Sequence, residues 1–249
     1  MSGTPEVDGE LPFLAHLIEL RERLLKAVAA VGVLFLAGIP FANRIYALLA
    51  QPLLDKMPAG TKMIAIEVAS PFLTPLKLTF FAALVVAMPF VLYQAWAFVA
   101  PGLYRHEKRL AVPLLVSAVA LFYTGCAFAY FLVLPAVFGF LQAVAPVGVA
   151  VMTDITQYLD FVLVLFLAFG LCFEVPVAVV ILVLLGWVTP AQLREARAYV
   201  IVGAFVIAAV LTPPDVVSQL LLAIPMCILY ELGILASRWL PARTEVAKT

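Results

Sequence analysis

The chain has 249 residues, of which 65% are hydrophobic and 12% are charged, and its mean hydropathy is +1.14. Soluble domains carry about 25% charged residues, so this chain has more apolar surface than one soluble core could bury. The sequence therefore predicts an integral membrane protein. A formal net charge of zero removes any argument for nucleic acid as a partner.

The N-terminal segment precedes the first apolar run. Residues 1–10 are acidic and lack a basic stretch, so we do not expect a cleaved secretory signal. Residues 11–23 are amphipathic and predict an interfacial helix before the first span. Within this segment Glu19 and Arg23 are spaced i, i+4, so an ion pair on the helix face explains the acid as well as a ligand site does.

Six apolar runs predict membrane spans, since a spanning helix needs about 20 mostly apolar residues. The runs lie at about residues 24–41, 76–99, 111–134, 158–185, 199–211 and 216–236. The fifth run is short, and the prolines at 213 and 214 predict a tight hairpin between the fifth and sixth spans. We expect one all-α membrane domain over residues 1–249, with short fifth and sixth helices.

The loop charges predict the orientation of these six spans. Eleven basic residues, Arg21 and Arg105 among them, fall on one side, and four fall on the other. By the positive-inside rule both termini are cytoplasmic. The long loop over residues 43–75 carries several prolines, among them Pro52, and predicts an ordered cap with short helices on the periplasmic side.

Glu174 is the most unusual residue, because it lies within the apolar fourth run. An acid near the membrane centre costs a few kcal/mol and rarely faces lipid. We expect it to face a polar cavity or a partner, or to be a protonated carboxyl bonded to a neighbouring helix. Thr212 and Gln219 form a polar patch at the hairpin turn, where they can bond within the chain or to a partner span. Asp215 can cap the sixth helix.

Several classes of protein lack support in the sequence. No phosphate-binding loop, zinc-protease motif or nucleophile elbow is present, and only two histidines occur. Cys126, Cys172 and Cys227 lie in separate apolar runs without metal-ligand spacing. We therefore expect neither an enzyme nor a bound cofactor or metal.

Five sequence strings point to a known family. They are His16 to Leu24 (HLIELRERL), Ala69 to Phe72 (ASPF), Phe98 to Arg109, Phe173 to Pro176 (FEVP) and Leu211 to Asp215 (LTPPD). In this order and at these spacings the chain resembles the TatC family, whose members are core receptors of the bacterial twin-arginine translocase.

The resemblance implies a receptor in the bacterial cytoplasmic (inner) membrane that binds the paired arginines of signal peptides on folded export substrates. Carried over by position, the binding site comprises Glu19, Arg21, Phe98, Glu107 and Arg109. Guanidinium groups form forked bonds to carboxylates that lysine cannot reproduce, which explains a ligand defined by two arginines.

The resemblance also implies a multimeric complex driven by the proton-motive force. Glu174 is expected on the concave face of the bundle, and Thr212 and Gln219 are expected to contact the single-span partners TatB and TatA. We expect Pro52, Pro89 and Asp215 to have structural roles.

Two other functions compete with this hypothesis. A proton-coupled secondary transporter could use Glu174 as its relay, although the sequence shows neither repeated halves nor paired broken helices. An intramembrane hydrolase would need a nucleophile and a base that the sequence does not offer.

Overall fold

The computed structural model describes residues 10–54, 64–99, 111–144, 154–211 and 216–238, and this part of the chain is almost entirely helical. Five of its helical stretches are long and apolar enough to cross a membrane, namely His16–Leu48, Ser70–Val99, Ala111–Phe140, Ile155–Leu184 and Ser218–Ser237. Arg197–Leu211 is a shorter apolar helix. The all-α class with membrane-length apolar helices, which the composition predicts, is confirmed.

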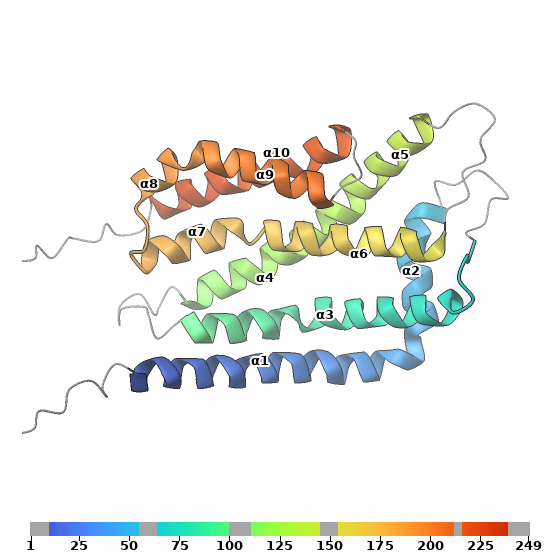
Figure 1. Cartoon of the computed structure of the whole chain (residues 1–249), viewed down its shortest axis with the longest axis horizontal. Coiled ribbons are helices and arrows are strands. Elements are labelled where there is room, and N and C mark those ends of the chain that lie inside the picture. The colour runs from blue at the N-terminus through green and yellow to red at the C-terminus, as the bar shows by residue number, and fades with distance from the viewer. Residues whose placement is uncertain (1–9, 55–63, 100–110, 145–153, 212–215, 239–249) are drawn as a thin grey trace, which may run out of the picture.

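The long helices lie side by side along one axis (Figure 1). One end of the bundle, which we call the α8 end, holds the start of α1 (Glu10–Gly38), the last turn of α3 (Ser70–Val99) and α8 (Pro190–Glu195). At the opposite end, the α2 end, η1 (Ile39–Phe41) leads into α2 (Ala42–Leu54), which runs across the bundle.

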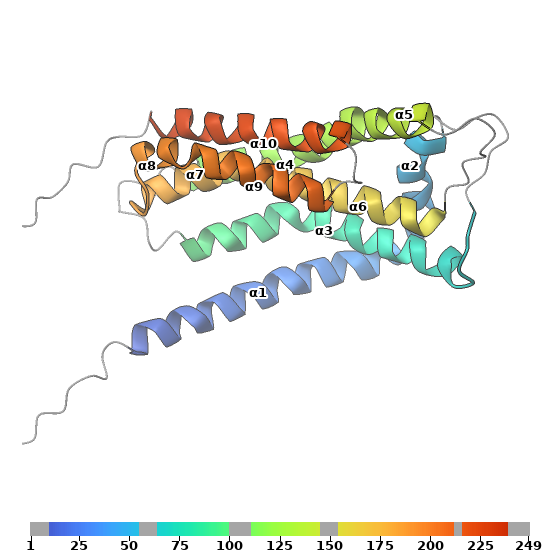
Figure 2. The same ribbon diagram turned by 45° about the horizontal axis from the view of Figure 1, so that its top comes forward.

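The helix α1 is continuous from Glu10 to Gly38. The expectation of a separate interfacial helix at 11–23, followed by a span from residue 24, therefore differs from the structure, in which both belong to one helix. The physical reason is the absence of a helix breaker inside this stretch, since Pro12 lies in the first turn, where its missing N–H costs no hydrogen bond. In Figure 2 this helix slants away from the rest of the bundle at the α8 end.

Two of the predicted spans contain irregular turns. In the third, α4 (Ala111–Phe128) passes through the π-helical turn η4 (Ala129–Val133) into α5 (Leu134–Val144), so this helical stretch continues beyond its expected end at 134. The turn precedes Pro135, which has no N–H to donate to the preceding turn. In the fourth, α6 (Ile155–Cys172) and α7 (Val175–Leu184) are separated at Phe173 and Glu174, because Pro176 cannot donate to the Cys172 carbonyl.

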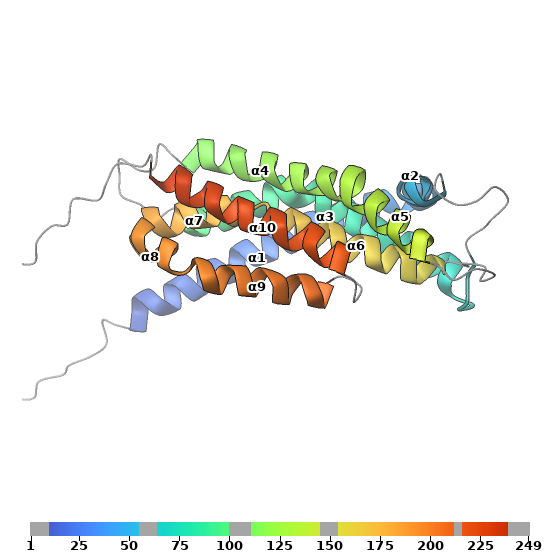
Figure 3. The same cartoon turned by 90° about the horizontal axis from the view of Figure 1, so that it is seen from above.

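The last two helices form the expected hairpin. The short fifth helix is confirmed, since α9 (Arg197–Leu211) has 15 residues. The expectation of a short sixth helix is wrong: α10 (Val216–Ser237) has 22 residues, or roughly 33 Å at 1.5 Å per residue. Its one acid, Glu231, is paired with Arg197 and does not interrupt it. Seen from above, α9 ends and α10 begins before the α2 end of the bundle (Figure 3).

The core lies where α3, α4, α5 and α6 meet, around the fully buried side chains of Leu78, Phe122, Val137 and Phe169. Two glycines let α4 and α6 approach closely. A Cβ at Gly125 would lie 2.5 Å from the Phe169 carbonyl oxygen, and one at Gly170 would lie 2.6 Å from the Phe122 ring. Small residues at such crossings are typical of membrane helices.

Pro89 lies inside α3, where a neighbouring helix supplies a backbone hydrogen bond that α3 itself cannot make. Because proline has no N–H, the carbonyl of Val85, four residues earlier, loses its helical donor. The Tyr123 hydroxyl of α4 donates to this carbonyl at 3.0 Å. Pro52 lies in the last turn of α2, and Asp215 lies outside the described residues.

Asp154 joins the segment before α3 to the start of α6 at the α2 end. Its carboxylate caps α6 by accepting the Gln157 N–H at 3.2 Å, and it accepts the Ile66 N–H at 3.3 Å. The Ile155 N–H donates to the Ile64 carbonyl at 2.9 Å. Sequence reasoning did not single out Asp154 as this cap.

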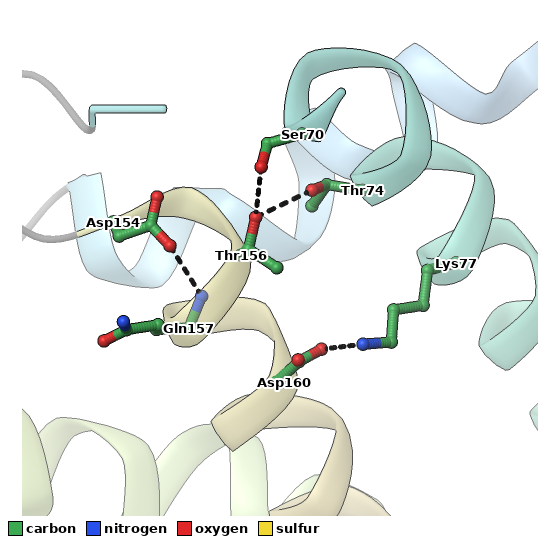
Figure 4. A network of polar contacts seen from close by, with 7 residues as sticks. All are labelled: Ser70, Thr74, Lys77, Asp154, Thr156, Gln157 and Asp160. Atoms are coloured by element: carbon green, nitrogen blue, oxygen red, sulfur yellow. Dashed lines mark hydrogen bonds and ion pairs between the residues drawn. The ribbon is translucent and has the colours of Figure 1, made fainter. Parts of the chain in front are cut away.

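Hydroxyl groups and an ion pair continue this polar network between α3 and α6 (Figure 4). The Thr156 hydroxyl donates to Ser70 Oγ at 2.8 Å and lies 3.3 Å from the Thr74 hydroxyl oxygen. One turn further into the bundle, Lys77 of α3 and Asp160 of α6 form an ion pair. The network therefore fixes α3 against α6 where the described chain reaches the α2 end.

We expect Gly125→Ala to lower the free energy of unfolding by about 1–3 kcal/mol, because the added methyl group overlaps the Phe169 carbonyl oxygen. Gly139→Ala is a matched control in α5, where an added Cβ would meet nothing within 4 Å. Unfolding of both purified variants in detergent measures the difference. Equal losses would contradict the close approach of α4 and α6.

Asp154→Ala removes the cap of α6, and we expect it to lower the free energy of unfolding by about 0.5–2 kcal/mol. Asp154→Asn keeps a side-chain acceptor and is the control. Amide hydrogen exchange at Ile66 and Gln157 should accelerate in the alanine variant and much less in the asparagine variant. Unchanged exchange at both amides would show that the cap contributes little.

Candidate functional site

The candidate residues within the described chain lie in three places. Glu19 and Arg21 of α1 and Phe98 of α3 lie at the α8 end, Glu174 lies between α6 and α7, and Gln219 lies near the start of α10. Four candidates fall outside the described residues: Glu107, Arg109, Thr212 and Asp215.

The Glu19 carboxylate holds a guanidinium group. Arg23, one turn further along α1, places its Nε at 3.0 Å and its Nη2 at 2.5 Å from Glu19 Oε1. The ion pair expected from the i, i+4 spacing is therefore confirmed. The Glu19 side chain remains 33% exposed, so its carboxylate can be reached from outside the protein.

His16 connects Glu19 to Phe98. Its ring stacks on Phe98, with centroids 4.2 Å apart and planes inclined by 22°, and its Nδ1 lies 4.0 Å from Glu19 Oε2. Because Phe98 belongs to the last turn of α3, this stack joins the two helices at the α8 end. The sequence singled out His16 only as the first residue of the HLIELRERL string; its position three residues before Glu19 is the signal that could have identified it.

Arg21 lies on another side of α1. Residues two apart on a helix do not face each other, and the Arg21 side chain is exposed. The structure therefore brings Glu19, His16 and Phe98 together without Arg21. Glu107 and Arg109 belong to the segment whose described neighbours, the last turn of α3 and the first turn of α4, both lie at the α8 end.

Glu174 occupies the break between α6 and α7. Its N–H donates to the Leu171 carbonyl at 3.1 Å, and its carbonyl accepts the Ala178 N–H at 2.9 Å. Its Oε1 is buried and has no hydrogen-bond partner among the described residues. The described helices thus do not give this oxygen the bond to a neighbouring helix that one interpretation of the sequence expected.

The α9–α10 hairpin carries polar contacts within the chain. Gln219 Nε2 donates to the Phe205 carbonyl at 3.1 Å, and Arg197 Nη2 lies 2.6 Å from Glu231 Oε2. The outer face of α10 is different. It exposes one apolar row at four-residue spacing, made of Val216, Leu220, Ile224, Ile228 and Leu232.

Metal ligands do not gather in the described part of the chain, where no group of three or more His, Cys, Asp or Glu could hold an ion. Cys126 and Cys172 are buried free thiols, and Cys227 is a half-buried one. The surroundings of Cys126 and Cys172 are those of core side chains.

Comparison with known proteins decides between the hypotheses. A family model described as Sec-independent protein translocase protein (TatC) matches residues 15–225. The chain belongs to the TatC family. The matched stretch contains every candidate residue named above, including those that lie outside the described part of the structure.

Individual TatC proteins are similar over nearly their whole length. TatC of Azotobacter chroococcum mcd 1 is 57% identical over 247 residues, which cover 99% of this chain and 97% of the relative. TatC of Escherichia coli strain K12 is 57% identical over 233 residues, covering 94% of this chain and 90% of the relative. Both are named Sec-independent protein translocase protein TatC.

A crystal structure of the twin-arginine translocase receptor TatC has the same fold. It aligns with a TM-score of 0.80 at 38% identity and covers 90% of this chain and 98% of that chain. TatC is a protein translocase component and not an enzyme family, in agreement with the sequence-based expectation. The alternative of a proton-coupled transporter gains no support from these TatC relatives.

We expect Glu174→Leu to leave the stability of this TatC-family chain unchanged or to raise it by about 1 kcal/mol, because the buried Oε1 loses no hydrogen bond. Tyr230→Phe is the contrasting control, since the Tyr230 hydroxyl donates to the Leu193 carbonyl at 2.8 Å and its loss should cost about 1 kcal/mol. Both are measured by unfolding in detergent. A loss in Glu174→Leu as large as in the control would show that the carboxyl has a partner.

Proposed function

We propose that this chain is the receptor subunit of a twin-arginine translocase and that it binds the paired arginines of signal peptides on folded precursor proteins. The observation that carries the proposal is the Glu19 carboxylate at the α8 end, which already accepts two N–H groups from a guanidinium. The proposed site consists of Glu19, Arg21, Phe98, Glu107 and Arg109.

The chemistry of the Glu19 site favours arginine over lysine. A guanidinium presents a planar fork of donors to a carboxylate, whereas an ammonium group is a point charge. Within one helix the Glu19–Arg23 pair is worth only about 0.2–0.5 kcal/mol, so a peptide arginine can replace Arg23 at small cost. The second peptide arginine would meet Glu107, and the Phe98 ring offers an aromatic face to either guanidinium.

We propose six crossings of the bacterial cytoplasmic (inner) membrane, with both termini in the cytoplasm and residues 1–249 as one membrane domain. The eleven basic residues that the sequence places on one side of the predicted spans support this orientation through the positive-inside rule. The helix α9 would span about 22 Å, against a hydrocarbon core of about 30 Å, by local thinning of the bilayer. The α2 end would then form the periplasmic cap.

We propose TatA-like and TatB-like single-span proteins as partners in a multimeric complex that uses the proton-motive force. The exposed apolar row of α10 has the four-residue spacing of one helix face and suits a partner helix. Thr212 and Gln219, near its start, would add polar contacts. Glu174, with a buried oxygen that lacks a partner in the described chain, would face the concave side of the bundle.

The test is binding of an Arg-Arg signal peptide and its Lys-Lys variant to the full chain in nanodiscs. We expect Glu19→Gln or Glu107→Gln to weaken binding of the Arg-Arg peptide roughly 10- to 100-fold, because each variant loses one or two charge-assisted hydrogen bonds. Either variant should also abolish the preference of the chain for the Arg-Arg peptide over the Lys-Lys peptide. Glu22→Gln is the matched control, because it changes an exposed acid three residues further along α1.

Unchanged selectivity in both Glu19→Gln and Glu107→Gln would overturn the proposed site. An equal loss of selectivity in Glu22→Gln would show that the peptide senses the net charge of this surface and not the fork geometry of one carboxylate.

A further inference from the structure

A groove of about 480 Å³ opens beside α3 at the α2 end, between the last turns of α1 and the start of α6. Pockets that bind small molecular groups have volumes of about 300–1,000 Å³. Figure 4 shows the polar wall of this groove, formed by Ser70, Thr74, Lys77 and Thr156. The groove lies at the opposite end of the bundle from Glu19.

The lining begins with polar residues at the α2 end and reaches aromatic rings further along α3. Glu67 and Ser70 lie where α3 starts, and Phe80 lies roughly 15 Å further along it, at 1.5 Å per residue, with Leu73, Thr74, Leu76 and Lys77 between them. Phe35 of α1 packs edge to face on Phe80, with centroids 5.7 Å apart, and the Phe80 side chain is 50% exposed. A bilayer makes the same change from headgroup to hydrocarbon over roughly 5–8 Å on each side.

The charges of the groove suit a zwitterion. The Lys77 ammonium has three donors and gives one to Asp160, so others remain for an anionic oxygen. Glu67 is exposed, three residues before α3 starts, and lines the same groove. With Lys77 balanced by Asp160, the carboxylate of Glu67 leaves a net charge of −1, which attracts a cation and repels an anionic headgroup.

We propose that this groove binds one zwitterionic phospholipid whose headgroup carries a primary ammonium, with the ammonium on Glu67, the phosphate beside Lys77 and an acyl chain along Phe35 and Phe80. The hydroxyls of Ser70 and Thr74 line the groove between the two charges. The lipid comes from the membrane leaflet at the α2 end. This inference does not depend on the proposed function, because it concerns other residues and another ligand.

The extent of the groove favours a lipid over a partner helix. A docked helix covers a long stripe, such as the apolar row of α10, whereas this lining runs over about 15 Å of α3 and combines both signs of charge with aromatic rings. A single lipid matches this length, with its headgroup near the charged side chains and an acyl chain along the aromatic rings.

The test is native mass spectrometry of the full chain released from membranes that contain equal amounts of phosphatidylethanolamine, phosphatidylcholine and phosphatidylglycerol with identical acyl chains. We expect one phosphatidylethanolamine to be retained roughly tenfold more than either other lipid, because among the three headgroups only its ammonium combines a positive charge with N–H donors to Glu67. Glu67→Gln should abolish this preference. Glu195→Gln, which changes an exposed acid at the α8 end, should preserve it.

A second variant tests the phosphate contact without leaving an unpaired charge. In Lys77→Gln with Asp160→Asn, retention of all three lipids at the groove should fall, because the phosphate loses its cation. Equal retention of the three lipids by the unchanged chain, or an unchanged preference in Glu67→Gln, would overturn the proposal. So would an equal loss in Glu195→Gln.

Discussion

In the hydrocarbon region no water is available, so each backbone N–H and C=O must find a partner within the protein. Proline removes one donor each time it occurs in a helix, and the irregular places of this bundle follow from that loss. At Pro89 the open carbonyl receives the Tyr123 hydroxyl from α4. Before Pro135 the helix widens into a π turn, and before Pro176 it ends and starts again.

The break before Pro176 also gives Glu174 its position. Three other acids of the described chain are paired with a base: Glu19 with Arg23, Asp160 with Lys77 and Glu231 with Arg197. Glu174 instead lies between two apolar helices and has a buried oxygen without a partner there. Since such a position costs a few kcal/mol, it indicates a role in function more than in stability.

The two ends of the bundle differ in how their polar side chains are held. At the α2 end Asp154, Thr156 and Ser70 bond to one another or to the backbone, which fixes α3 against α6. At the α8 end the Glu19 carboxylate is paired with Arg23 and approached by His16, both residues of its own helix, and it remains partly exposed. An ion pair within one helix is weak, so it leaves the Glu19 carboxylate open to the proposed exchange of Arg23 for a peptide arginine.

The sequence by itself determined what depends on composition and on local spacing. It predicted the apolar helices, the short α9 with its hairpin, and the Glu19–Arg23 pair, because each involves residues close together in the chain. Only the tertiary structure decided that the His16 ring stacks on Phe98. The same holds for the hydrogen bond from the Tyr123 hydroxyl to the Val85 carbonyl and for the one from the Ile66 N–H to the Asp154 carboxylate. These contacts join residues far apart in the sequence, and helix packing, which no local pattern encodes, brings them together.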